Sequence, residues 1–244
     1  MITTVAGATA RSLLARRRAA LMLLLAALPV MFGVIAYLRG PMGDPAAQVA
    51  ETLDLVVVGM LLPLLALVFG TAALGAELED GSAIHLLTKP VARWRIVTAK
   101  ILAAALLAAG VAGVTTLLTG LLVGGLHGAA GVAIAYTVAV VVGAVLYVTV
   151  FVALSILTTR ALIIGLAYVV IWEGTLAGLF EGTRVLSIRQ YVGSIAVAIN
   201  PSAAVPGSDV LAPATAVAGT VIVLVVAFVV AVRALERFRL SAGD

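Results

Sequence analysis

The sequence predicts an all-α integral membrane protein with six transmembrane helices, built as one membrane domain over residues 1–244. Composition is the first observation: 64% of the residues are hydrophobic, 11% are charged and the mean hydropathy is +1.25. So little polar surface cannot cover a water-soluble globule. The second observation is that the apolar residues fall in runs of about 20, the length that one helical crossing requires. The third is that charged residues gather between these runs.

Six apolar runs define the predicted spans. They cover residues 19–38, 55–74, 101–126, 132–157, 161–180 and 214–232. The first run follows three arginines at 16–18, as in a signal peptide, but it continues to Leu38. A signal-peptide core is only about 7–15 residues long, so we predict a retained span. In the second run, Gly59 and Pro63 predict a local distortion, because proline removes a backbone hydrogen bond.

The basic residues predict a topology with both termini in the cytoplasm. Twelve of the 15 Lys and Arg residues then lie on the inner side, and only Arg39, Arg184 and Arg189 lie outside. The positive-inside rule predicts this skew for an even number of spans. It also explains the net charge of +4 without a nucleic-acid partner. We expect a multi-pass protein of the cell membrane, namely a bacterial inner membrane, surrounded by membrane lipid.

Metal and disulfide chemistry find little support in the sequence. The chain has no cysteine, which excludes disulfides and thiolate metal sites, and its two histidines are isolated, so we expect no metal site.

A charged segment, residues 77–100, joins the second and third spans and holds both lysines of the chain. Asp80-Gly81-Ser82 offers helix-start chemistry, and Pro90 disfavours helical geometry at the residue before it. The sequence therefore predicts a short surface helix from Ser82 to Lys89. A second helical run follows Pro90 and leads into the third span. It places three residues on one face: Arg93, Val97 and Lys100.

This segment resembles the signature of ABC-2-type permeases, the transmembrane subunits of one class of ATP-binding cassette exporters. The matching residues are Glu77-x-Glu79-x-Gly81-Ser82, then Leu86-Leu87-x-Lys89-Pro90-x-x-Arg93, then Lys100. In that family a cytoplasmic coupling helix joins the second and third spans. The chain departs from the family in having Ser82 where threonine is commoner and Lys89 where serine or arginine is frequent. Elsewhere the resemblance rests on span count and loop lengths.

The resemblance implies two sets of functional residues. Residues of the coupling helix would contact an ATPase subunit: Ser82, Ile84, His85, Leu87 and Lys89. Residues at the helix ends on either side of it would form an ion pair at a hinge: Glu77 or Glu79 with Arg93 or Lys100.

The chain itself has no Walker A loop, because neither lysine closes a glycine-rich run before Ser or Thr. We therefore expect a transporter subunit without catalytic residues and without a cofactor of its own. ATP and Mg²⁺ would bind two separate cytoplasmic ATPase subunits, and a second permease copy or a paralogue would complete the complex.

The outer connection, residues 181–213, is the second long one. Apolar residues at helical spacing predict an amphipathic helix that ends at Asn200-Pro201. Its apolar face consists of Val185, Ile188, Val192, Ile195 and Ile199, and its polar face of Arg184, Ser187, Arg189, Gln190 and Ser194. The ABC-2-type permeases are similar here, with a short helical hairpin that dips into the outer leaflet between spans five and six. It would form a lid.

Glu173 is a candidate pathway residue. At about 1.5 Å per residue it lies roughly 20 Å from Arg160 at the inner face, where a charge is costly and marks a pathway. Alternatively the fifth span ends near Trp172, and Glu173 belongs to the outer hairpin.

The function that the resemblance implies is outward transport of a hydrophobic or amphipathic substrate, such as a drug, an antimicrobial peptide or a lipid. An intramembrane lipid-modifying enzyme is an alternative, because Asp80-Gly81 hints at metal binding, but the further aspartates that it needs are missing. An ion channel is another, although no selectivity filter is evident.

Overall fold

The computed structural model describes residues 16–40, 43–79, 92–124, 127–176 and 181–237, and every regular element within these ranges is a helix. In chain order the elements are α2 (Arg16–Arg39), α3 (Pro45–Thr52), the π-helix η1 (Leu53–Leu61), α4 (Leu62–Glu79), α6 (Arg93–Val123), α7 (Ala130–Leu157), α8 (Ala161–Ala167), the π-helix η3 (Tyr168–Leu176), the 3₁₀-helix η4 (Glu181–Leu186), α10 (Ile188–Ile199), the 3₁₀-helix η5 (Pro201–Ala203) and α11 (Pro213–Arg237).

Five of the described helices are long and apolar enough to cross a membrane. They are Met22–Arg39, Pro45–Leu74, Arg93–Val123, Ala130–Leu157 and Pro213–Arg237. The predicted fifth span corresponds to a shorter apolar helix, Ala161–Thr175. The predicted fold class, an all-helical membrane protein, is therefore confirmed over the described ranges.

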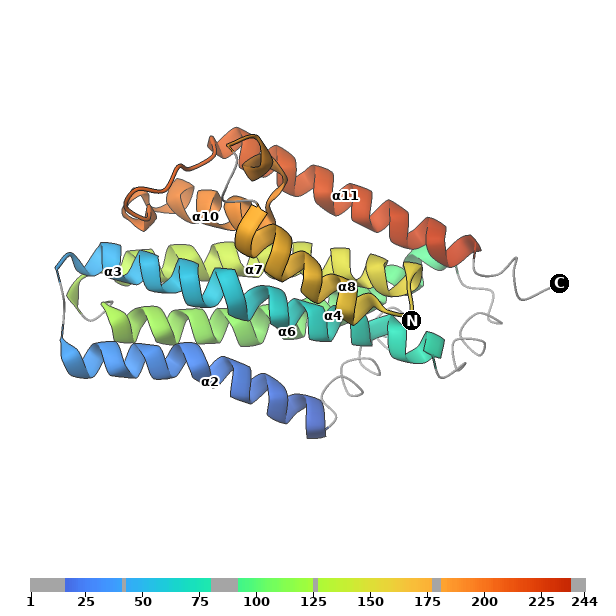
Figure 1. Cartoon of the computed structure of the whole chain (residues 1–244), viewed down its shortest axis with the longest axis horizontal. Coiled ribbons are helices and arrows are strands. Elements are labelled where there is room, and N and C mark those ends of the chain that lie inside the picture. The colour runs from blue at the N-terminus through green and yellow to red at the C-terminus, as the bar shows by residue number, and fades with distance from the viewer. Residues whose placement is uncertain (1–15, 41–42, 80–91, 125–126, 177–180, 238–244) are drawn as a thin grey trace.

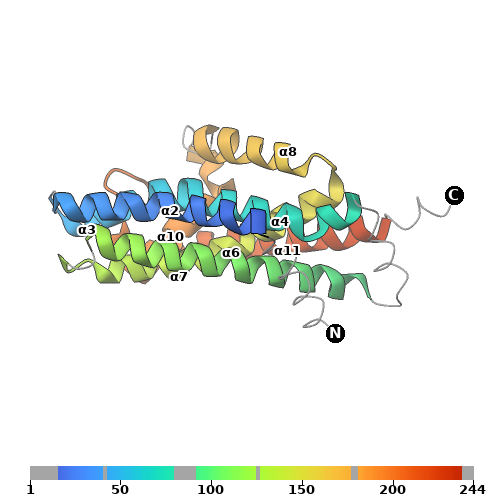
Figure 2. The ribbon, with the colours of Figure 1, turned by 90° about the horizontal axis from the view of Figure 1, so that it is seen from below.

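α7 is the centre of the bundle. The helices α4, α6, α10 and α11 all pack against it. Its most apolar stretch is 67% buried, against 17% for α2 and for α11, which lie on opposite sides of the bundle (Figure 1). Small residues permit close packing, since a Cβ on Gly120 of α6 would lie 2.6 Å from the Cβ of Ala133 on α7. Figure 2 shows α8 on one side of the bundle, where its apolar surface is largely exposed.

The second crossing helix begins earlier than the predicted residue 55. It begins at Pro45, where Asp44 is the N-cap and its Oδ1 accepts a hydrogen bond from the Ala46 N–H at 3.1 Å. Proline suits this first turn because no helical hydrogen bond needs its missing N–H. Hydropathy missed the start of the helix because residues 45–54 include several polar side chains.

The predicted distortion near Gly59 and Pro63 is confirmed, and it takes the form of a π-helix over Leu53–Leu61. At its end the Leu62 N–H bonds to the Val57 carbonyl, five residues back. Pro63 has no N–H to donate, and a change of helical register is one way in which a membrane helix accommodates the loss.

The third crossing helix begins at Arg93, so the predicted helical run after Pro90 and the third span form one continuous helix, α6. Its first turns carry basic residues, which the apolar-run criterion excluded. The predicted face is confirmed: Val97 is fully buried, Lys100 is 2% exposed and Arg93 is half-buried. At the other helix ends the bounds shift by a few residues, to Val123, Ala130 and Arg237.

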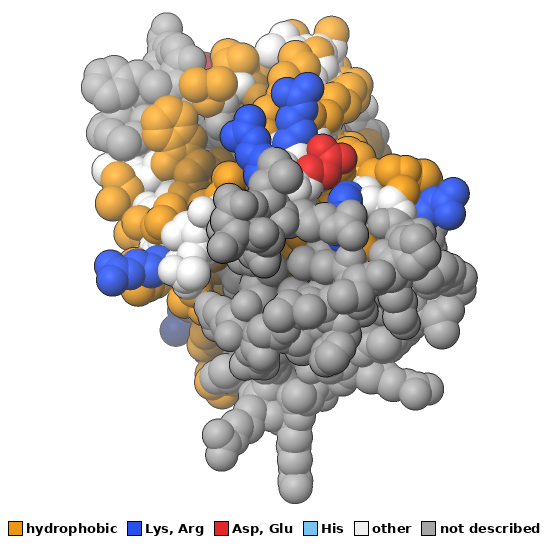
Figure 3. Space-filling view, turned by 90° about the vertical axis from the view of Figure 1, so that its right-hand side faces the viewer, with side chains coloured by type: hydrophobic (Ala, Val, Ile, Leu, Met, Phe, Trp, Pro, Cys, Tyr) orange, Lys and Arg blue, Asp and Glu red, His pale blue; other side chains and the backbone are white. Residues whose placement is uncertain are grey.

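The two ends of the bundle differ in charge. One end, here called the α10 end, holds α10, the start of α3 and the end of α6 (Figure 1). Its exposed charged residues, among those described, are Arg39, Asp44, Glu51 and Asp209. The opposite end, here called the Arg93 end, holds the starts of α2, α6 and α8 and the end of α11. Figure 3 shows Lys and Arg side chains and an acidic side chain on this end; the exposed charged residues in the described ranges are Arg95, Arg160, Arg233, Glu236 and Arg237.

Candidate functional site

The helix α10 lies antiparallel against α7 and extends to the middle of that helix. A Cβ on Gly131 would lie 2.8 Å from Nδ2 of Asn200, which follows α10, and a Cβ on Gly143 would lie 2.5 Å from Cγ2 of Val192. The stretch of α7 between these glycines is about 18 Å long. Because Gly143 lies near the midpoint of Ala130–Leu157, the first turn of α10 lies deep among the crossing helices.

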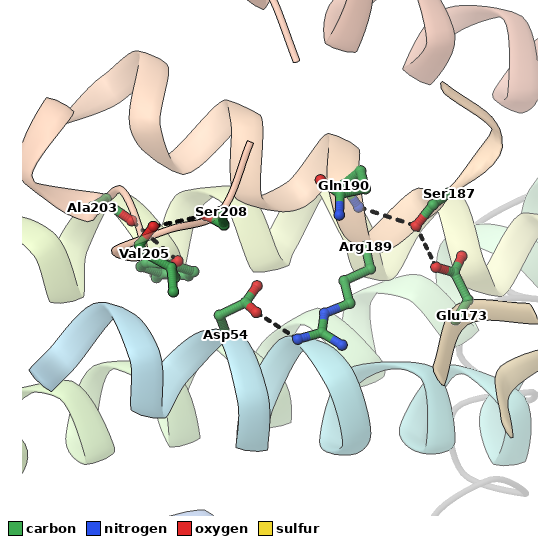
Figure 4. Close-up of polar contacts among 9 residues, drawn as sticks. Asp54, Glu173, Ser187, Arg189, Gln190, Ala203, Val205 and Ser208 are labelled. Atoms are coloured by element: carbon green, nitrogen blue, oxygen red, sulfur yellow. Dashed lines mark hydrogen bonds and ion pairs between the residues drawn. The ribbon is translucent and has the colours of Figure 1, made fainter. Parts of the chain in front are cut away.

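Arg189, in that first turn, forms an ion pair with Asp54 of η1. The distance from Arg189 Nη2 to Asp54 Oδ2 is 2.5 Å, and the two side chains are 26% and 22% exposed. The Arg189 side chain extends from α10 toward the helix that carries Asp54 (Figure 4). Gly59 makes room for it, since a Cβ there would lie 3.4 Å from the guanidinium carbon. In apolar surroundings each charge depends on the other, because an unpaired charge is strongly unfavourable.

Glu173 of η3 binds the same turn of α10 from a second direction. It is 5% exposed, and its carboxylate accepts hydrogen bonds from Tyr168 Oη at 3.0 Å, Ser187 Oγ at 2.5 Å and the Ile188 N–H at 2.9 Å. Ser187 is the N-cap of α10, and its hydroxyl also accepts from the Gln190 N–H at 3.3 Å. A carboxylate at a helix N-terminus satisfies free amides and is favoured by the helix dipole.

Both acidic residues lie on π-helical segments, Asp54 on η1 and Glu173 on η3. Short π-helical segments in α-helices are frequent at functional sites. Here they bring two carboxylates from two different helices to three consecutive residues, Ser187 to Arg189. This cluster of five residues is the candidate functional site.

A polar cavity of about 50 Å³ lies beside the ion pair. Both members of the pair line it, together with Tyr136, Ser194 and Asp209. The segment after α10, residues 203–211, borders the cavity and is held by two hydrogen bonds. Tyr136 Oη donates to the Ala203 carbonyl at 3.2 Å, and the Leu211 N–H donates to Ser194 Oγ at 3.1 Å. The cavity therefore lies beside the ion pair, between α10, α7 and the segment that follows α10.

The residues predicted to couple to an ATPase lie outside the described residues. They are Ser82, Ile84, His85, Leu87 and Lys89. Glu77 and Glu79 belong to the end of α4, and their side chains are likewise outside the described part. Arg93 and Lys100 lie in the first turns of α6, at the same end of the bundle. The hinge ion pair thus stays a prediction. Among the described residues, no group of three or more His, Asp or Glu side chains could hold a metal ion.

Glu173 was predicted to lie either in the fifth span or in an outer hairpin. It lies on η3, which continues α8 without a break, and it is buried. Its three hydrogen bonds give it a structural role as the cap of α10, and its contact with a transport pathway stays a prediction.

The sequence alone did not predict Asp54, Arg189 or Ser187 as members of this site. Asp54 lies one residue before the predicted second span, and Arg189 and Ser187 lie on the polar face of the predicted amphipathic helix. Two signals were available: one acidic residue at the start of an apolar run, and one arginine on a mostly apolar helix. The two residues are 135 positions apart, so the sequence does not show that they pair.

The fold and the site define a multi-pass helical membrane protein in which two carboxylates hold a short helix between the crossing helices. A family model described as ABC-2 family transporter protein matches residues 14–181. The match covers more than half of the chain, and the chain therefore belongs to the ABC-2 transporter family. The resemblance indicated by residues 77–100 is thereby confirmed. No curated protein matches the chain.

Proposed function

We propose that this chain is the permease subunit of an ATP-binding cassette exporter. It moves a hydrophobic or amphipathic substrate, such as a drug, an antimicrobial peptide or a lipid, out of the cell. The observation that carries the proposal is the family match over residues 14–181, which includes the whole charged segment 77–100. ATP and Mg²⁺ bind two separate ATPase subunits, and a second permease copy or paralogue completes the assembly.

The proposed topology has six spans, with α8 and η3 as the fifth, and both chain termini in the cytoplasm. The charges at the two ends of the bundle support it. Among the described residues, four exposed arginines lie at the Arg93 end, against one, Arg39, at the α10 end, which is the asymmetry of the positive-inside rule. In this orientation the Arg93 end faces the ATPase, and α10 dips into the outer leaflet as a lid. The host membrane is a bacterial inner membrane.

Force from the ATPase enters through the coupling helix, Ser82–Lys89, which connects α4 and α6. The burial of Lys100 supports a hinge ion pair there, because a lysine that is 2% exposed needs a counter-charge. Glu77 and Glu79, at the end of α4, are proposed as its partners.

Co-purification tests this function. The chain is expressed with candidate ATPase subunits, and the complex is isolated from membranes and reconstituted. We expect an ATPase to co-purify, and its turnover to rise with the transported compound. Leu87→Asp places a charge on the docking helix and should abolish co-purification. Arg95→Gln removes an exposed charge from the same end of the bundle but outside the docking helix, and co-purification should persist.

Failure of every ATPase to co-purify with the wild-type chain would overturn the permease function. If the Leu87→Asp chain retained the ATPase as well as the Arg95→Gln chain does, the permease function would stand and the assigned docking helix would be wrong.

A further inference from the structure

The two carboxylates that bind the first turn of α10 differ in how readily their contacts with it can break. Asp54 makes one contact, with the Arg189 side chain, and both side chains are partly exposed, 22% and 26%. Glu173 is 5% exposed and has three donors, one of them the backbone N–H of Ile188. A contact between two side chains can break without any change of the backbone. The Glu173 contacts cannot all break in this way, because one of them is to the backbone N–H of Ile188 at the start of α10.

We propose that the Asp54–Arg189 pair is a releasable latch that holds α10 closed, and that Glu173 is the fixed pivot about which α10 moves. The proposal rests on the proposed function in one respect, namely that the transport cycle opens the lid. The latch itself is a property of this chain.

The connectivity of the chain supports this division of roles. Glu173 precedes Ser187 by 14 residues and Ile188 by 15, so its contacts join neighbouring parts of the chain that can move as one unit. The Asp54–Arg189 contact spans 135 residues and joins that unit to a different crossing helix. Release of this contact would therefore remove the ion pair between α10 and η1 and leave α10 capped by Glu173.

The polar cavity supports the latch as the point of opening. It borders both members of the pair and contains the hydroxyls of Tyr136 and Ser194. Water that enters here can solvate the two charges as they separate, which lowers the cost of breaking an ion pair in apolar surroundings.

Gly59 and the π-helix η1 complete the latch. The guanidinium of Arg189 lies against the backbone at Gly59, where any side chain would crowd it. The carboxylate comes from the same π-helical segment, one turn earlier. Asp54 and the backbone against which the Arg189 guanidinium packs are therefore both on η1, whereas Glu173, the pivot, is on η3.

Thiol labelling tests the latch directly, because the chain has no cysteine. Ser194→Cys introduces a thiol at the cavity, at a position that is 2% exposed, and Ile188→Cys introduces one beside the pivot, also 2% exposed. Each variant is reconstituted in lipid vesicles as the full chain and treated with a membrane-impermeant maleimide. We expect slow labelling of both thiols. Asp54→Asn should then speed labelling at position 194 about tenfold or more, which corresponds to about 1.4 kcal/mol of latch energy, and leave labelling at position 188 within twofold.

Asp209→Asn is the matched control. Asp209 also pairs with an arginine of the α10 region, Arg184, but its side chain is 75% exposed. Exposed ion pairs contribute little, so this change should alter labelling at position 194 less than twofold. Arg189→Gln breaks the latch from its other side and should reproduce the effect of Asp54→Asn, which covers the case in which one of the variants does not accumulate.

Equal labelling at position 194 in the Asp54→Asn, Arg189→Gln and Asp209→Asn backgrounds would overturn the latch. Equal acceleration at positions 188 and 194 would overturn the pivot, because α10 would then leave as a whole. These measurements use no ATPase and no substrate, so they stand even if co-purification fails. With a partner ATPase present, ATP should speed labelling at position 194 in the wild-type background, and absence of that effect would count against the link to transport alone.

Discussion

Replacing Gly143 by alanine tests how closely α10 is seated on α7. A Cβ at this position would lie 2.5 Å from Val192 Cγ2 and 2.9 Å from Leu62 Cδ2, both closer than real Cβ contacts allow. Neither neighbour has free space, because Val192 is 1% exposed and Leu62 is fully buried. The substitution must therefore displace α10 or strain α7, and overpacking of this kind costs about 1–3 kcal/mol.

Gly110→Ala provides the matched control for helix propensity. Gly110 also lies inside a crossing helix, α6, but a Cβ there would meet nothing within 4 Å. Both substitutions gain up to about 1 kcal/mol because alanine favours helix over glycine. The difference in the free energy of unfolding between the two variants is therefore the overpacking cost, about 1–3 kcal/mol. A difference of 2 kcal/mol corresponds to roughly 4–8 °C in Tm for a chain of this size.

The assay is thermal unfolding of the purified chain in detergent, completed as a double-mutant cycle. Val192→Ala removes the methyl group that the new Cβ would meet, so it should cost less in the Gly143→Ala background than in the wild type. Two results would contradict the close packing of α10 on α7 at Gly143. One is a Tm for Gly143→Ala that equals or exceeds that of Gly110→Ala, and the other is the same cost of Val192→Ala in both backgrounds.

Three further predictions concern single polar contacts. Tyr136→Phe should lower the free energy of unfolding by about 1 kcal/mol, because the Ala203 carbonyl loses its buried donor; an unchanged Tm would show that the bond contributes nothing. Glu173→Gln should cost about 1.5–3 kcal/mol, since it removes the charge from a carboxylate with three donors, and a Tm within 1 °C of wild type would contradict the role of this residue as cap. Lys100→Glu should impair ATPase coupling in the reconstituted complex, and Glu77→Lys in the same chain should restore part of it; a double variant no better than either single one would rule out that hinge pair.

Much of the fold could be predicted because membrane insertion is decided locally. A run of about 20 apolar residues must form a helix in lipid whatever its neighbours are, since no water is present to satisfy its backbone. The errors came where a helix carries polar residues at its ends. The helix start at Pro45 was missed because Glu51 and Asp54 interrupt the hydropathy signal inside the helix.

The amphipathic helix after residue 184 shows why the candidate site was harder to predict. Its existence and its end at Asn200 were correct, and two residues of its predicted apolar face, Ile188 and Val192, are buried. On the predicted polar face, however, Ser194 is 2% exposed, whereas Ile199 on the apolar face is 48% exposed. In a soluble protein the polar face meets solvent, but lipid is itself apolar. Periodicity in a membrane helix therefore identifies two faces without saying which one is inside.

Composition and short motifs are enough to predict the class of the protein, its apolar crossings, the asymmetry of its basic residues and its family. The contact between Asp54 and Arg189 and the capping of α10 by Glu173 become visible only in the folded chain. The physical reason is that a charge in an apolar medium must find its counter-charge among whichever helices are its neighbours. That neighbourhood is set by packing at small residues such as Gly143, between segments far apart in the chain.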